Sequence, residues 1–203
     1  MNWQEIFNTI RKKKWLFFWL TVFGVVLFFD LSLLQTPQYE AKSKVLVIQK
    51  QTQGQDIYTV SKSAQYLSRA LKEGIYSDDF FQEVMSSSDK VSFNDFPENN
   101  KDRREKWQEG IEVIIFQDLG SMAIEVYHPN AKKAQAINQA ITNTLAQNHQ
   151  DYHGGGNNVS VKVLDYPSVS QKPVKPNPWL NSIFGGILAI VIGLWLAFRK
   201  KRY

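Results

Sequence analysis

Two long apolar stretches interrupt an otherwise mixed chain of 203 residues. They cover residues 15–34 and 180–198, and each is close to the ~20 apolar residues that cross a bilayer as a helix. Between them, apolar and polar residues alternate or recur with helical spacing, as in a folded domain whose surface meets water. We therefore expect two transmembrane helices, 15–34 and 180–198, with one domain between them.

The pattern between the two runs predicts a layer of helices on a sheet. Strands are expected at 39–49, 111–116, 121–127 and 159–166, the middle two forming a hairpin. Helices are expected at 60–74, after Ser77, at 101–108 and after Asn130, with Ser77 and Asn130 as caps and a loop at 86–100. The expected fold class is α/β (α+β), a small mixed sheet with packed helices. The first strand leaves the membrane and the last returns to it, so these two should run antiparallel.

Basic residues border both apolar runs on the side of the chain ends. They are Arg11, Lys12, Lys13 and Lys14 before the first run, and Arg199, Lys200, Lys201 and Arg202 after the second. Because cytoplasmic flanks of membrane helices are enriched in Lys and Arg, we expect 1–14 and 199–203 to be cytoplasmic and 35–179 to lie outside. These eight residues outweigh the net charge of +5, and residues 35–179 hold sixteen Lys and Arg against seventeen Asp and Glu, so the charge does not indicate nucleic-acid binding.

The N-terminal tail has an amphipathic pattern. Asn2 and Glu5 resemble a capping box, and Trp3, Ile6, Phe7 and Ile10 share one helical face. We expect residues 1–14 to include a short helix on the cytoplasmic surface of the bilayer, although its apolar face could instead receive a partner protein.

Cleavage signals would change this topology. Residues 35–39 offer no small-x-small site for a signal peptidase, and no LPxTG motif precedes the second run, so both runs are expected to remain as spans. Asp30 falls inside the first span near its outer end, where we expect it to be solvated or to pair with a neighbouring subunit.

Few residues could carry chemistry. The chain has no cysteine, and its three histidines lack the spacing of a metal site or a catalytic group. We expect His128, His149 and His153 to be solvated, and Gly154 to Gly156 to be a linker without the Lys-Ser/Thr of a phosphate loop. No enzyme activity, cofactor or metal is expected.

The approach to the second span combines prolines with small residues. Pro167, Pro173, Pro176 and Pro178 predict an extended, semi-rigid strut over residues 167–179, since proline fixes φ and removes donors. Gly185, Ala189, Gly193 and Ala197 then recur every fourth residue, as in a stripe on which membrane helices pack closely. We assign this stripe to helix packing and oligomerisation, against the alternative that it is the ordinary glycine and alanine content of a span.

At this point the chain resembles the polysaccharide co-polymerases, the Wzz-like chain-length determinants. The resemblance rests on the segments IRKKKWLFFW, PQYEAKSKVLVI, HPNAKKAQAINQAI and KPVKPNPWLNSIFGGILAIVIG. It implies a non-enzymatic, two-pass protein of the cell (inner) membrane with a Wzz-like domain over 35–166. Such a protein forms a homo-oligomeric ring beside a Wzy-type polymerase and regulates the length of an O-antigen, capsule or exopolysaccharide glycan chain.

The chain departs from larger members of that family. Residues 86–100 leave no room for a long helical arm, and the chain shows no P-loop and no tyrosine-rich tail. We therefore expect a compact type without a fused kinase, which partners a separate cytoplasmic tyrosine kinase or needs none. Two alternatives stay open. A membrane-tethered ligand-binding or sensor domain would need a cytoplasmic output module, and a wall-anchored surface protein would need the missing sorting motif.

Overall fold

The computed structural model describes residues 11–50, 56–116, 120–154 and 156–199, with side chains up to Ala197. The chain divides into two compact units. One comprises Met1–Pro37 with Lys175–Tyr203, and the other is Gln38–Val174. The amphipathic segment expected at residues 2–10 lies outside the described residues.

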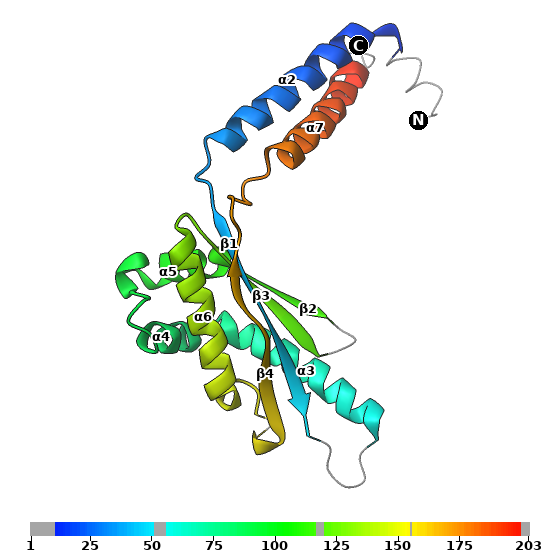
Figure 1. Cartoon of the computed structure of the whole chain (residues 1–203). Helices are drawn as coiled ribbons and strands as arrows, with labels where there is room; N and C mark the ends of the chain where they lie inside the picture. The colour runs from blue at the N-terminus through cyan, green and yellow to red at the C-terminus, as the bar shows by residue number, and fades with distance from the viewer. Residues whose placement is uncertain (1–10, 51–55, 117–119, 155, 200–203) are drawn as a thin grey trace. The chain divides into compact units, whose positions relative to one another are not determined.

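The first unit is a pair of long apolar helices. Helix α2 spans Lys14–Leu33 and α7 spans Pro178–Arg199, and both are long and apolar enough to cross a membrane. They run antiparallel side by side (Figure 1), with Ser32 near Asn181 at one end and Phe17 near Gly193 at the other. Most of their large side chains, including Trp15, Phe23 and Ile187, are exposed. Such a surface suits lipid.

The second unit is a four-stranded sheet with helices. Its strands are β1 (Tyr39–Gln49), β2 (Ile111–Phe116), β3 (Ser121–His128) and β4 (Val159–Val169), in the order β2-β3-β1-β4. The predicted α/β class is confirmed, but all three strand pairings are antiparallel, so the expected mixed sheet is corrected to an antiparallel one. The first and last strands are direct neighbours, as well as antiparallel.

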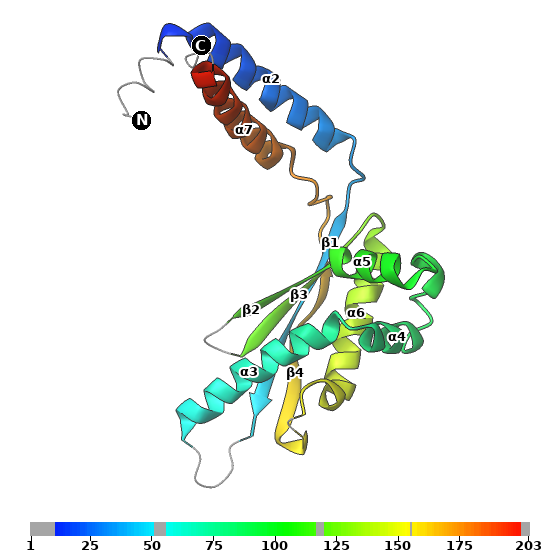
Figure 2. The ribbon, with the colours of Figure 1, turned by 180° about the vertical axis from the view of Figure 1, so that it is seen from behind.

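Four helices accompany the sheet, seen from both sides in Figures 1 and 2. They are α3 (Ile57–Ile75), α4 (Asp78–Ser86), α5 (Asn100–Gly110) and α6 (Ala131–Asn148). Short 3-10 turns occur at Phe93–Asp95, His149–Tyr152 and Gly156–Asn158. The predicted caps are confirmed, because Ser77 accepts from Phe80 N–H and Asn130 accepts from Lys132 N–H. Helix α3 begins earlier than expected because Asp56 caps it through Thr59 N–H at 2.8 Å.

The core lies on one face of the sheet. Alternate residues of β1, namely Ala41, Val45 and Val47, are buried with Leu71 of α3 and Ile141 of α6, as period-two patterning requires. A second group surrounds Trp107 of α5, whose Nε1 donates to Ile75 O at 2.8 Å. Burial of these two groups packs the helices of this unit against one another and against the sheet.

The opposite face of the sheet carries charge. Glu125 of β3 is only 6 % exposed and accepts from Lys42 Nζ at 2.5 Å and from Tyr127 Oη at 2.8 Å. The hydrogen bond to Glu125 raises the pKa of Lys42, and burial raises that of Tyr127. Because Lys42 and Glu125 are cross-strand partners, this ion pair reinforces the register of β1 on β3.

Candidate functional site: the paired spans and the proline segment

The small-residue stripe of α7 faces α2 of the same chain. Gly185, Ala189, Gly193 and Ala197 are all buried, whereas Ile187 and Val191 between them are exposed. A Cβ added at Gly185 would lie 2.5 Å from Gly24 O and 2.7 Å from Phe28 Cβ. One added at Gly193 would lie 2.9 Å from the Phe17 ring. The stripe therefore lets the two helices of one chain approach closely, as small residues do in membranes.

Sequence reasoning missed the partner of the stripe. Gly24 of α2 is buried, and a Cβ there would meet Ala189 Cβ and Gly185 O, both at 2.7 Å. A lone glycine among bulky apolar residues gave no periodic signal. The described contacts assign the stripe to packing within the chain, and its role in oligomerisation stays a prediction.

Polar groups tie one end of the helix pair. Asn181 Nδ2 donates to Ser32 Oγ at 3.0 Å, and Ser182 Oγ donates to Pro178 O at 2.7 Å. Ser32 and Ser182 are both buried; the bond of Ser32 links the two helices, whereas that of Ser182 lies within α7, and each satisfies a polar group in an apolar surrounding. Asp30 is exposed. Its solvation at the membrane surface, or its pairing with a neighbouring subunit, stays a prediction.

The basic residues occupy the other end of the pair. Arg11, Lys12 and Lys14 are exposed, Lys13 is half-buried, and Arg199 is the last residue of α7. Lys200, Lys201 and Arg202 lie outside the described residues. Lys14 at the start of α2 and Arg199 at the end of α7 thus lie at the same end of the antiparallel pair.

The four prolines have different surroundings. Pro167 lies within β4, beyond the expected end of that strand, and Pro173 is exposed in the segment that follows. Pro176 follows a cis peptide bond, and Pro178 is the first residue of α7, a position where its missing N–H is tolerated.

The segment after β4 is bonded to the start of β1. Ser170 N–H donates to Glu40 O and Val174 N–H donates to Gln38 O, both at 2.8 Å. Glu40 N–H in turn donates to Ser170 Oγ at 3.0 Å. The chain consequently enters and leaves this unit at adjacent points, and residues up to Val174 are attached to the sheet.

The histidines are less exposed to solvent than the sequence predicted. His149 is only 6 % exposed, and its ring stacks on that of His153 with Nδ1 and Nε2 2.7 Å apart. His128 Nδ1 accepts from Asn130 N–H at 2.9 Å. The expectation was wrong for His149, because the turn His149–Tyr152 to which it belongs packs against α3, α6 and β4. In the described part of the chain, no three histidine or acidic side chains cluster as metal ligands would.

The histidine pair should make stability depend on pH. Burial lowers the pKa of both His149 and His153 below 6.5, so the unfolded chain binds more protons as pH falls through that value. The stability that the two neutral histidines contribute is therefore fully present above pH 6.5, and it is lost as the pH falls below this value. We expect the melting temperature to drop more between pH 7 and pH 5 in the wild type than in His149→Gln. Burial also lowers the pKa of His128, but this residue is present in both proteins and contributes equally to both drops. Equal drops would therefore contradict a contribution from His149.

Together, the helix pair and the sheet unit define a membrane protein with an α/β domain inserted between two spans. Residues 1–88 match the model of the Wzz family, described as chain length determinant protein. No curated protein matches the chain. The matched region includes α2, β1, α3 and α4, so the N-terminal part of the chain is similar to the Wzz family. Wzz proteins are non-enzymatic regulators of chain length in polysaccharide synthesis.

Proposed function

We propose that this protein regulates chain length in the synthesis of a surface polysaccharide, as a homo-oligomer that works beside a Wzy-type polymerase. The observation that carries the proposal is the Wzz match over residues 1–88, which includes the whole first span and the first strand. No catalytic step is assigned to the chain in this role. Its contribution is to present an external domain that is attached to the membrane at both ends.

The proposed topology has both termini in the cytoplasm and residues 35–179 outside. The basic residues before α2 and Arg199 at the end of α7 adjoin one end of the helix pair, and this supports a common cytoplasmic side. The domain's entry and exit are bonded together through Gln38 and Val174, which fits attachment to one membrane face. Single cysteines can test this, because the natural chain has none. A cysteine replacing exposed Lys172 should react with an impermeant thiol reagent in intact cells or spheroplasts, and one replacing Lys12 should not.

The function itself is tested by deleting the gene. We expect surface glycan from the deletion strain to lose its preferred length distribution on a gel, and a plasmid copy to restore it. An unchanged distribution would overturn the proposal and favour a membrane-tethered sensor. Oligomerisation has a separate measurement, native mass spectrometry of the detergent-extracted protein, where a monomer alone would contradict a ring.

A further inference from the structure

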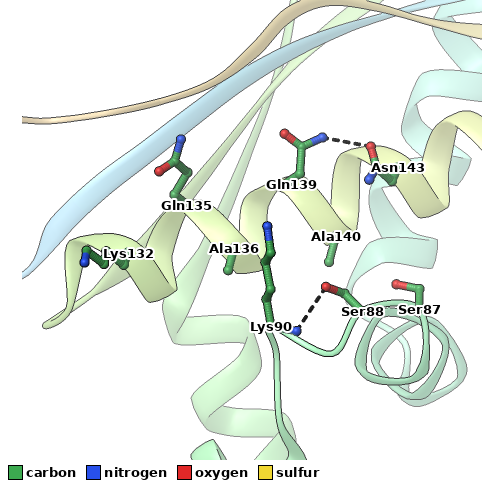
Figure 3. A pocket seen from close by; sticks show the side chains of 9 residues that line it. All are labelled: Ser87, Ser88, Lys90, Lys132, Gln135, Ala136, Gln139, Ala140 and Asn143. Atoms are coloured by element: carbon green, nitrogen blue, oxygen red, sulfur yellow. Dashed lines mark hydrogen bonds between the residues drawn. The ribbon is translucent and has the colours of Figure 1, made fainter.

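A groove lies between α6 and the segment that follows α4. It has a volume of about 470 Å³ and is lined by Ser87, Ser88, Lys90, Lys132, Gln135, Ala136, Gln139, Ala140 and Asn143 (Figure 3). This volume falls within the ~300–1,000 Å³ of ordinary small-molecule sites. The hollow exists because Ala136 and Ala140 are small where α6 faces the loop.

One wall of the groove is a row of side-chain amides. Gln135, Gln139 and Asn143 are spaced by four residues, so they lie on one face of α6. Gln139 Nε2 donates to Asn143 Oδ1 at 2.8 Å, and the Gln135 amide has no partner among the described residues. Ser87 and Ser88 also line the groove (Figure 3); the Ser87 hydroxyl donates to Val84 O at 2.9 Å, and the Ser88 hydroxyl accepts from Lys90 N–H at 3.3 Å. Amides and hydroxyls that both donate and accept are suited to the hydroxyl groups of sugars.

The charge of the groove is positive. Lys132 comes from the first turn of α6 and Lys90 from the facing loop, with its side chain extended toward α6 (Figure 3). Both are exposed, and within the described ranges neither ammonium group has an ion-pair partner. None of the lining residues is acidic, although Asp89 adjoins Lys90 in the chain. Two unpaired ammonium groups beside neutral amides favour an anionic ligand that also carries hydroxyls.

We propose that this groove binds a segment of the polysaccharide and that the segment contains acidic sugars. The proposal rests on the proposed function, and it adds the chemical class of the glycan and the residues that contact it. Lys90 and Lys132 would hold carboxylate groups, while the amides of α6 would bind ring hydroxyls. Because the lysines are exposed, binding should weaken as salt rises.

The test measures binding to the full-length protein in detergent by titration calorimetry. The probes are tetragalacturonate, which is acidic, and maltotetraose, a neutral sugar of the same length. We expect the wild type to bind the acidic probe at least tenfold more tightly, and Lys90→Gln with Lys132→Gln to lose about tenfold in affinity. The matched control is Lys162→Gln with Lys172→Gln, which removes two exposed lysines away from the groove and should leave binding unchanged.

A third variant tests the position of the ligand independently of charge. Ala136→Leu places a larger side chain in the hollow and should abolish binding while the circular dichroism spectrum stays that of the wild type. The proposal is overturned if the wild type binds neither probe or binds both equally, or if the control variant loses as much affinity as the groove variant. These outcomes are separable from the deletion experiment, since glycan length can depend on the protein without any contact at this groove.

Discussion

Replacing Gly185 with leucine is expected to drive α2 and α7 apart. The added side chain would meet Gly24 O and Phe28 Cβ, which are backbone and near-backbone atoms that cannot move aside without shifting α2. Overpacking of this kind costs about 1–3 kcal/mol, and ~1.4 kcal/mol is a tenfold change in an equilibrium constant. The equilibrium constant for pairing of the two helices should therefore fall about tenfold or more.

A disulfide reporter can measure this. Ser32 and Asn181 already contact each other at the end of the pair, and the chain has no other cysteine to interfere. Ser32→Cys with Asn181→Cys should cross-link within one chain on mild oxidation, and Gly185→Leu should reduce the yield strongly. Val191→Leu adds bulk on the exposed face of α7 and serves as the control. If Gly185→Leu and Val191→Leu cross-link equally well, the close approach at Gly185 does not hold the pair.

Replacing Asn138 with leucine should destabilise the sheet unit more than most single changes in it. Asn138 is fully buried in α6, and its Nδ2 donates to Ala41 O of β1 and to Ile124 O of β3, both at 2.8 Å. Leucine cannot donate these two hydrogen bonds, so Ala41 O and Ile124 O would lose them in a part of the core that water does not reach. Since an unsatisfied buried group costs about 1–3 kcal/mol, the unfolding free energy should fall by roughly 2–4 kcal/mol.

Thermal unfolding of the full-length protein, followed by circular dichroism, gives the measurement. A loss of this size corresponds to a fall in melting temperature on the order of 10 °C for a domain of this length. Gln147→Leu makes a similar change at an exposed position of the same helix and should shift the midpoint little. Equal midpoints for the two variants would show that the bridge between the strands contributes no net stability.

The sequence predicted local structure well where the signals are local. Strand β1 has the predicted bounds, the hairpin forms as expected, and the caps Ser77 and Asn130 start their helices. These features depend on alternation and on hydrogen bonds between residues two or three apart, and both can be read from neighbouring letters.

The sequence did not predict features that depend on contacts between segments far apart in the chain. β4 continues through Pro167 because it is the edge strand beside β1, where a residue without an N–H is tolerated. Its register also shifts between Lys42 and Val45, which no local pattern reveals. The contact of Gly24 with the α7 stripe and the burial of His149 depend likewise on segments far away in the chain.

The bonded neighbours β1 and β4 have a mechanical consequence. The ends that lead to α2 and α7, Gln38 and Val174, are hydrogen-bonded to each other, so a force that pulls these two ends apart acts across the ladder and not along it. The hydrogen bonds of an antiparallel ladder then break one after another, starting with Val174 to Gln38 and Ser170 to Glu40. The domain should thus yield to separation of its attachments at low force, by peeling from this end, while the core around Val45 and Val47 stays closed.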